Sequence, residues 1–439
     1  MGAPAIHSGS RVSLHPLTIR QEDGEFIVGR VETGTFVCLP EIGVRALEIL
    51  RQGGTLDEAE ARLAAADGST VDLQAFAVEL LNLGFVAAVD GDPTRSSGTA
   101  RSHFPWLQPR HVRWLFSWPV AAAFWAILAA AAVTAVLHPD VLPRYSDFFW
   151  SPLMSLVIVV NLVLGTFHLV IHEMAHLVAA RAEGIPAHIR PGTRLQYLVL
   201  QTDVRGAWAL PRSARYRIYL AGILWDLLAL SLLILALVYA GLPPTAQALL
   251  AAWILLIFFG VVGEFSFYMR TDIYFVFLDL LHSRNLFQDA QRLLLHRWRQ
   301  TLHRLLPKRR ALPPDPWLGL SASERRKAGF YAWLLITGTI ITLARYLYLG
   351  IPILLRLVSQ SAGSLAGGLQ TNDPTRILDS GLTLLAIFAT QALFVATFLH
   401  NRRAALASAS AAIGRMFKAP SASPAGSTKS DSPPPTLAP

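Results

Sequence analysis

Long apolar segments follow a shorter N-terminal region in which apolar and polar positions alternate. Up to about residue 92 no apolar run is long enough to cross a bilayer, whereas beyond residue 114 runs of about 20 residues recur, the length that spans a membrane as a helix. Six spans are predicted: Leu115–Leu137, Pro152–Ala180, Ile218–Tyr239, Ala246–Met269, Phe330–Leu349 and Leu378–Leu399. The pattern predicts a mainly α, polytopic α-helical membrane protein with a small α+β domain at its N-terminus.

Residues 1–92 have the pattern of that small domain. Phe26–Val28, then Val31 and Thr35–Val37, predict two short strands around the turn Glu32–Gly34. Apolar positions at helical spacing then predict three helices, the second of which opens at the capping sequence Thr55–Glu58. Phe85–Val89 predicts a closing strand. A hairpin, three helices and a final strand together predict a winged-helix-like module.

The rest of the chain divides by composition. Residues 93–114 form a polar, basic linker before the membrane domain, residues 115–400, and residues 401–439 are assigned to a tail whose Ser, Pro and Ala content predicts disorder. Between the second and third spans, residues 184–213 are too polar to cross a membrane. Leu195–Gln201 favours a strand there, which predicts a β-hairpin beside the membrane site; the alternative is a loop that lies on the membrane.

Composition and charge support a membrane protein and argue against nucleic-acid binding. Of the 439 residues 53% are hydrophobic and 15% charged, and the mean hydropathy is +0.42. The formal charge is +9, but residues 284–327 alone hold eleven Lys or Arg residues, whereas residues 139–148 hold only Arg144. Positive charge beside membrane spans marks the cytoplasmic side. We therefore expect a multi-pass bacterial cell-membrane protein with both termini in the cytoplasm, and a helix around Leu293–Leu305 on the lipid surface.

His172, Glu173 and His176 form a His-Glu-x-x-His motif inside the otherwise apolar second span. Side chains four residues apart share a helix face, so both imidazoles can bind one metal ion while Glu173 acts as a base for water. Ionisable groups are costly in a bilayer and mark function where they occur. Because Cys38 is the only cysteine, the metal must be held by His, Asp or Glu. The motif predicts one Zn²⁺ per chain.

A catalytic zinc ion takes three protein ligands, so a third ligand must come from a later segment. Four carboxylates are candidates: Asp226, Glu264, Asp272 and Asp279. Asp272 follows the fourth span and lies level with His172 by helical rise, which makes it the preferred ligand. Asp226 is the alternative ligand. Glu264 lies deeper and suits a structural or proton-handling role, and Asp279 is expected to be solvated.

One further histidine, His168, lies a helical turn before His172 on the same face. It is a candidate for adjusting the properties of the metal site without binding the metal itself. The alternative is a histidine that is packed or hydrogen-bonded between helices.

Six segments of the membrane domain match the pattern of a known family. They are His172–His176, Ala179–Gly184, Leu220–Gly222, Arg270–Tyr274, Asp279–Leu281 and Arg284–Leu286. Across residues 152–286 the chain resembles the site-2 protease family of intramembrane zinc metalloproteases, especially its peptide-maturation branch. The resemblance implies that the zinc ligands are His172, His176 and Asp272, with Glu173 as the base. Ile273 stands where the family usually has glycine, and no Asn-Pro pair precedes the aspartate.

The N-terminal domain has a resemblance of its own. The residues that carry it are Thr35–Glu41, Ala46–Leu50, Gly54–Glu58 and Leu80–Val86. Over about residues 13–90 they resemble the PqqD-like domains that recognise leader peptides for enzymes maturing ribosomally made peptides. The resemblance implies that a leader peptide adds as a strand beside the hairpin. The alternative is an ordinary winged-helix domain that binds DNA, but the helix predicted at residues 72–83 has no Lys or Arg for phosphate contacts.

Together these features predict an intramembrane zinc metalloendopeptidase that trims a small ribosomally made precursor peptide captured by the N-terminal domain. A peptide-modifying enzyme or a transporter is a further expected partner beside the lipid bilayer. Two alternatives remain. One is a regulatory site-2-type protease that cleaves a transmembrane anchor, and the other is a non-catalytic, zinc-bound membrane scaffold for peptide export.

Overall fold

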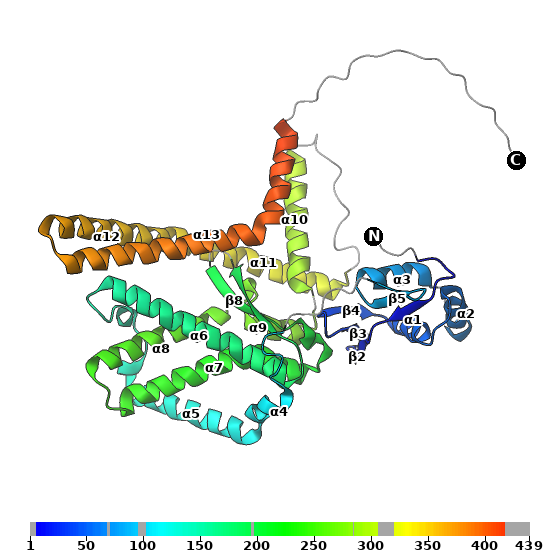
Figure 1. Cartoon of the computed structure of the whole chain (residues 1–439), viewed down its shortest axis with the longest axis horizontal. Helices are drawn as coiled ribbons and strands as arrows, with labels where there is room; N and C mark the ends of the chain where they lie inside the picture. The colour runs from blue at the N-terminus through cyan, green and yellow to red at the C-terminus, as the bar shows by residue number, and fades with distance from the viewer. Residues whose placement is uncertain are drawn as a thin grey trace, which may run out of the picture.

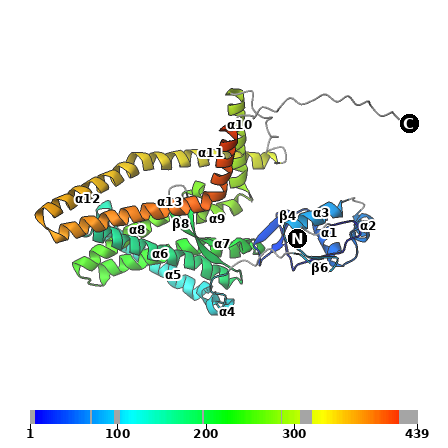
Figure 2. The same ribbon diagram turned by 45° about the horizontal axis from the view of Figure 1, so that its top comes forward.

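The computed structural model describes residues 6–67, 71–94, 102–194, 197–283, 285–305 and 320–417. A small mixed domain lies at one end of a bundle of long helices (Figure 1). Turning the molecule keeps the same separation between the two parts (Figure 2). The structure is thus mainly helical, with a small N-terminal part that contains the sheets β1–β6.

The N-terminal domain contains three helices and two antiparallel sheets. One sheet has the order β2–β3–β4, and the other has the order β1–β5–β6. The elements are β1 (Val12–Leu14), β2 (Thr18–Glu22), β3 (Glu25–Arg30), β4 (Thr35–Leu39), α1 (Glu41–Arg51), α2 (Leu56–Asp67), α3 (Leu73–Asn82), β5 (Val86–Val89) and β6 (Asp92–Pro93). The predicted hairpin is β3–β4 and the predicted closing strand is β5. The short strand β1, which pairs with β5, was not predicted.

The core of this domain follows from its amphipathic helices. Val28 on β3 packs against Leu47, Leu63 and Leu80, which come from α1, α2 and α3 in turn. Asp72 caps α3 by accepting a hydrogen bond from the Ala75 N–H at 2.8 Å, as expected of a short acidic residue before a helix. These contacts leave β4 at the edge of its sheet, where its outer side pairs with no strand of the described chain.

Six helices among the described residues are long and apolar enough to cross a bilayer, which indicates a multi-pass membrane protein. These candidate spans are α5 (Trp118–Leu137), α6 (Met154–Ala182), α7 (Arg212–Tyr239), α8 (Pro244–Glu264), the continuous helix Ala322–Thr371 and α13 from Pro374 to His400. Helix α7 is central, because it packs against α5, α6 and α8, while α13 lies along the other side of α6 (Figure 1). The outward faces carry exposed apolar side chains, as a lipid-facing surface requires.

The fifth span is longer than predicted. Helix α11 (Ala322–Arg345), a π-helical turn (Tyr346–Gly350) and α12 (Ile351–Thr371) form one helix of 50 residues, which is about 75 Å by helical rise. The predicted span ended at Leu349. The residues that follow, Gly363 and Gly367 among them, continue the helix to a tight turn at Asn372.

The last helix also extends beyond its prediction. Helix α13 (Pro374–Phe417) continues through residues 401–417, the first part of the tail that we predicted to be disordered. Residues 418–439 of that tail lie outside the described residues. Within the bundle, Asp379 on α13 accepts hydrogen bonds from the Ser155 N–H at 2.8 Å and the Ser155 hydroxyl at 2.6 Å, which ties α13 to the start of α6.

Shorter elements lie at the end of the bundle nearest the N-terminal domain. They are α4 (Pro109–Val112), β7 (His188–Arg194), β8 (Tyr197–Asp203), the 3-10 helices Arg205–Ala209 and Phe267–Met269, α9 (Asp272–Leu280) and α10 (Leu286–Leu305). The predicted hairpin is β7–β8, although Leu195 and Gln196 at its turn lie outside the described residues. Helix α10 runs across the direction of the long helices (Figure 1), the orientation expected of a helix on a membrane surface.

A buried charge cluster docks the N-terminal domain on the bundle. Arg215 on α7 has no exposed surface, and its guanidinium donates to Asp279 on α9 at 2.8 and 3.0 Å and to Glu22 on β2 at 2.8 and 3.1 Å. The guanidinium also lies 5.0 Å from the ring of Trp208. We expected Asp279 to be solvated. This prediction is wrong, because the Asp279 carboxylate is buried and accepts hydrogen bonds from Arg215.

Candidate metal centre

Helix α6 supplies the motif and ends close behind it. His172, Glu173 and His176 are all buried, with exposed fractions of 6, 7 and 5%. The helix stops because Gly184 adopts φ +78°, which lets the Ile185 N–H bond back to the Ala180 carbonyl at 2.9 Å. The motif therefore lies about two turns from the end of α6 nearest the N-terminal domain.

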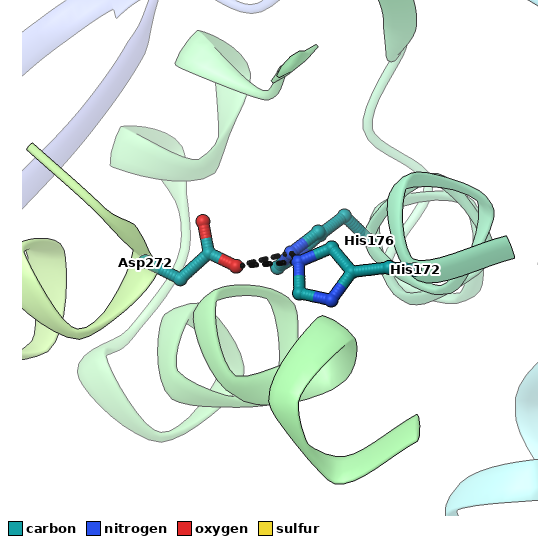
Figure 3. Close-up of side chains that lie close together, drawn as sticks. All are labelled: His172, His176 and Asp272. Carbon is teal, nitrogen blue, oxygen red and sulfur yellow. Dashed lines mark hydrogen bonds and ion pairs between the residues drawn. The ribbon is translucent and has the colours of Figure 1, made fainter. Parts of the chain in front are cut away.

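Three donor atoms converge from two elements (Figure 3). Oδ2 of Asp272 lies 3.1 Å from Nε2 of His172 and 2.6 Å from Nε2 of His176, and the two Nε2 atoms are 3.2 Å apart. A tetrahedral zinc ion at about 2.0–2.1 Å from each donor places donors roughly 3.3 Å apart. The separations of 3.1 and 3.2 Å are close to that value and the separation of 2.6 Å is shorter, and the three donor atoms lie near enough together to hold one metal ion.

The tautomer of each imidazole is set by the hydrogen-bond acceptor at its Nδ1 atom. Nδ1 of His172 lies 2.9 Å from Oδ2 of Asp226, and Nδ1 of His176 lies 2.7 Å from the carbonyl oxygen of Ile218. Each acceptor requires a proton on Nδ1, which leaves Nε2 of each ring with a free lone pair for a metal. Helix α7 provides both acceptors.

Helix α7 also approaches the centre with its backbone. Gly222 lies against the two imidazoles, and a Cβ added there would overlap Nε2 of both His172 and His176. Any side chain at this position would therefore displace the two imidazoles, which explains the glycine in the segment Leu220–Gly222 of α7.

Asp272 reaches the centre because the fourth span ends early. Helix α8 stops at Glu264, and Arg270 then adopts a left-handed conformation with φ +58° before α9 begins at Asp272. The Glu264 carboxylate accepts the Asp272 N–H at 2.8 Å, and the Thr271 hydroxyl donates to the Glu264 carbonyl at 2.5 Å. The prediction that Glu264 lies deeper than Asp272 is wrong, because the helix does not continue to Met269. Glu264 instead positions the start of α9.

Asp226, the alternative ligand, binds His172 from behind and is not among the converging donors. Its other oxygen, Oδ1, lies 2.8 Å from Nε2 of His168, so His168, Asp226 and His172 form a chain of hydrogen bonds. Asp226 is 3% exposed, and both of its oxygens are engaged by histidine. The carboxylate therefore orients the His172 ring and increases its basicity.

Replacing Asp226 by Asn should weaken metal binding without unfolding the chain. The amide keeps the shape but loses the negative charge that holds the His172 Nδ1–H, and such changes lower metal affinity about 10–100-fold. Competition between the purified protein and a zinc chelator would measure the effect. Ser231→Ala on the same helix is the control, because Ser231 bonds the Leu227 carbonyl away from the centre. Equal zinc affinity in both variants would contradict this role for Asp226.

The position of Glu173 is fixed by the hairpin. The Thr202 hydroxyl on β8 lies 2.6 Å from Oε2 of Glu173 and 3.0 Å from the Glu173 carbonyl oxygen. Glu173 is thus held beside the metal ligands by a contact that crosses from α6 to β8. Thr202 was not predicted as a site residue, because a threonine near the end of a short strand belongs to no sequence motif for a metal site.

Two cavities meet at the centre. The larger, about 750 Å³, is lined by Glu173, His176 and Asp272, by Gln201–Arg205 of the hairpin region, and by Gly34 and Phe36–Cys38 of the N-terminal domain. We call it the site cavity. The smaller, about 240 Å³, is lined by His168, His172, Asp226, Glu264 and β8 residues Val199 and Leu200. Glu173 and Asp272 line both cavities.

Comparisons with family models, with curated proteins and with solved structures find no match to this chain. The two family resemblances therefore rest on the residues quoted for them.

Proposed function

We propose that this protein is an intramembrane zinc metalloprotease that cleaves a small ribosomally made precursor peptide. The observation that carries the proposal is the convergence of His172, His176 and Asp272 on one point, with Glu173 fixed beside it at the end of a cavity. A purely structural zinc site is closed by a fourth protein ligand. Among the described residues the converging group has three members, and an acidic side chain lies next to it, as hydrolysis requires.

Zinc is the metal that this donor set suits, since two imidazole nitrogens and one carboxylate oxygen form a common catalytic ligand set. Zinc held by these residues would supply a Lewis acid that polarises the scissile carbonyl and lowers the pKa of water toward about 7. His172 and His176 enter this role as neutral rings, because their Nδ1 protons are directed to Asp226 and to the Ile218 carbonyl.

Glu173 handles the proton. The Thr202 hydroxyl binds Oε2, so Oε1 takes a proton from the attacking water as the water oxygen bonds to the carbonyl carbon. The same carboxyl group then delivers the proton to the amide nitrogen as the C–N bond breaks. The products are a new carboxylate and a new amine, and no redox partner is needed.

Two strand edges border the site cavity, which suits a peptide in extended form. Strand β4 is an edge strand of the N-terminal domain, and β8 pairs with β7 alone among the described strands. Residues of both strands line the cavity that ends at Glu173. A leader peptide that adds to β4 would therefore place its following segment along β8 and next to the metal centre.

We place the N-terminal domain and the mouth of the site cavity on the cytoplasmic side of a bacterial cell membrane, because α10, a helix rich in arginine, lies at this end of the bundle. The single, exposed Cys38 is a natural reporter of this topology. A membrane-impermeant maleimide should label Cys38 in permeabilised cells and leave it unlabelled in intact cells. Labelling in intact cells would place the N-terminal domain outside.

The function itself is tested by a search for cleavage. Purified protein in lipid nanodiscs is mixed with the short peptides encoded next to its gene, and new termini are read by mass spectrometry. One sample is used as purified, one after zinc removal, and one after zinc is restored. We expect one new pair of termini that disappears and returns with zinc. Intact peptides in all three samples, with zinc bound, would contradict the proposal and favour a scaffold role.

A further inference from the structure

The site cavity carries an excess of positive charge. Three arginines line it: Arg190, Arg205 and Arg270. Arg205 is balanced by Asp203, whose carboxylate lies 2.8 Å from the Arg205 guanidinium. Burial raises the pKa of Asp203, but the hydrogen bonds from Arg205 outweigh it and hold the pKa below its ordinary value. Both members of this pair are therefore charged, and the pair has no net charge.

The other two arginines are not balanced. Arg190 on β7 and Arg270 before α9 are both exposed in the cavity wall, and no carboxylate among the described residues forms an ion pair with either. The Arg270 guanidinium lies 4.9 Å from the ring of Phe287. That cation–π contact holds the side chain in place and leaves its charge uncompensated.

The remaining acids on the wall belong to the metal centre. Glu173 and Asp272 carry two negative charges, which a bound divalent cation would match. The rest of the lining is neutral or apolar, including Gln201, Asn285 and Gln288. With a metal in place, Arg190 and Arg270 leave the cavity with two unmatched positive charges.

We propose that the site cavity selects peptides that carry carboxylate groups close to the scissile bond, and that Arg190 and Arg270 determine this specificity. Guanidinium groups bind carboxylates through paired, charge-assisted hydrogen bonds, and a half-enclosed cavity screens them less than open water does. The inference rests on the proposed function, because it names the substrate class of the same site. The carboxylate can belong to Asp or Glu side chains or to a peptide C-terminus.

Binding is measured separately from cutting. The Glu173→Gln chain in nanodiscs of neutral lipid is titrated with a short fluorescent peptide that alternates alanine and glutamate, and with matched peptides containing glutamine or lysine. We expect the glutamate peptide to bind about tenfold more tightly than the glutamine peptide, the difference that one or two charge-assisted contacts supply. Versions with a free or an amidated C-terminus distinguish side-chain recognition from recognition of the terminal carboxylate.

Substitutions then assign the preference. Arg190→Gln and Arg270→Asn should each remove most of it, whereas Arg270→Lys should keep part of it; Asn is chosen because it tolerates the positive φ of Arg270. Arg292→Gln on α10 removes the same charge outside the cavity and should leave binding unchanged.

Equal affinity for the glutamate and glutamine peptides would overturn the proposal. So would a preference that Arg292→Gln reduces as much as the cavity variants do. If the arginine variants change retention on vesicles of anionic lipid but not peptide binding, these side chains serve the lipid surface and the proposal is wrong. Failure of the proposed function looks different: the glutamate preference persists, but wild-type chain cuts no peptide.

Discussion

Glu173→Gln should abolish peptide cleavage while one zinc ion remains bound per chain. The amide has the size of the carboxylate and can still accept the Thr202 hydroxyl, which lies 2.6 Å from Oε2. It cannot take a proton from water at neutral pH, and a positioned general base contributes about 10²–10⁴-fold to rate. Cleavage of the identified peptide should therefore fall by at least about a hundredfold.

The measurement combines mass-spectrometric cleavage rates with metal analysis of the same samples. Glu183→Gln is the matched control, because Glu183 lies at the end of the same helix and pairs with the exposed Arg217 at 2.6 Å. It should cleave at the wild-type rate. Loss of zinc together with activity in Glu173→Gln would mean that the side chain holds the metal centre together. Unchanged cleavage would remove Glu173 from the reaction.

Arg215→Met should destabilise the protein and release the N-terminal domain from the bundle. The change leaves the Asp279 carboxylate, whose side chain is only 4% exposed, without its ion-pair partner. It also removes the buried arginine among the three that pair with Glu22, so that Arg20 and Arg212 alone remain beside that carboxylate. Removing one member of a buried ion pair costs about 3–5 kcal/mol, because the remaining charge is uncompensated. Thermal unfolding in nanodiscs should show a clear fall in the transition temperature, and proteolysis should separate the two domains faster.

Two further variants separate charge from size. Arg217→Met removes a partly exposed guanidinium from the same helix and should cost no more than about 1 kcal/mol, as surface pairs do. Combining Arg215→Met with Asp279→Asn removes both charges of the buried pair and leaves Glu22 with Arg20 and Arg212, so it should recover most of the lost stability. A double variant as unstable as Arg215→Met would show that the packing of the arginine, not its charge, joins the domains.

The apolar pattern predicted the candidate spans well because bilayer length and helical rise restrict what such runs can form. It failed where local backbone geometry decides. The apolar residues after Glu264 continue the pattern of the fourth span, but α8 ends at Glu264, and a 3-10 turn followed by the left-handed Arg270 brings Asp272 to the centre. The pattern also did not show that the fifth helix continues to Thr371, where α12 packs against α13.

The side chains that could hold a metal ion were predictable for a different reason than the residues that support them. His172, Glu173 and His176 stand at a spacing that has a chemical meaning on one helix. Thr202, Asp226 and Arg215 act through partners far away in the chain; Arg215 and Glu22 are 193 positions apart. Such pairs depend on the tertiary arrangement and leave no local pattern to find.

The shared lining of the site cavity has a consequence for turnover. Strand β4 and the candidate metal centre border one cavity, so under the proposed function capture and cutting would occur on a single body rather than on two that separate. Cleavage would remove the mature segment, but the leader fragment would keep its contacts with β4. Departure of that fragment would then be the slow step of each cycle, and the free leader would act as an inhibitor of its own removal.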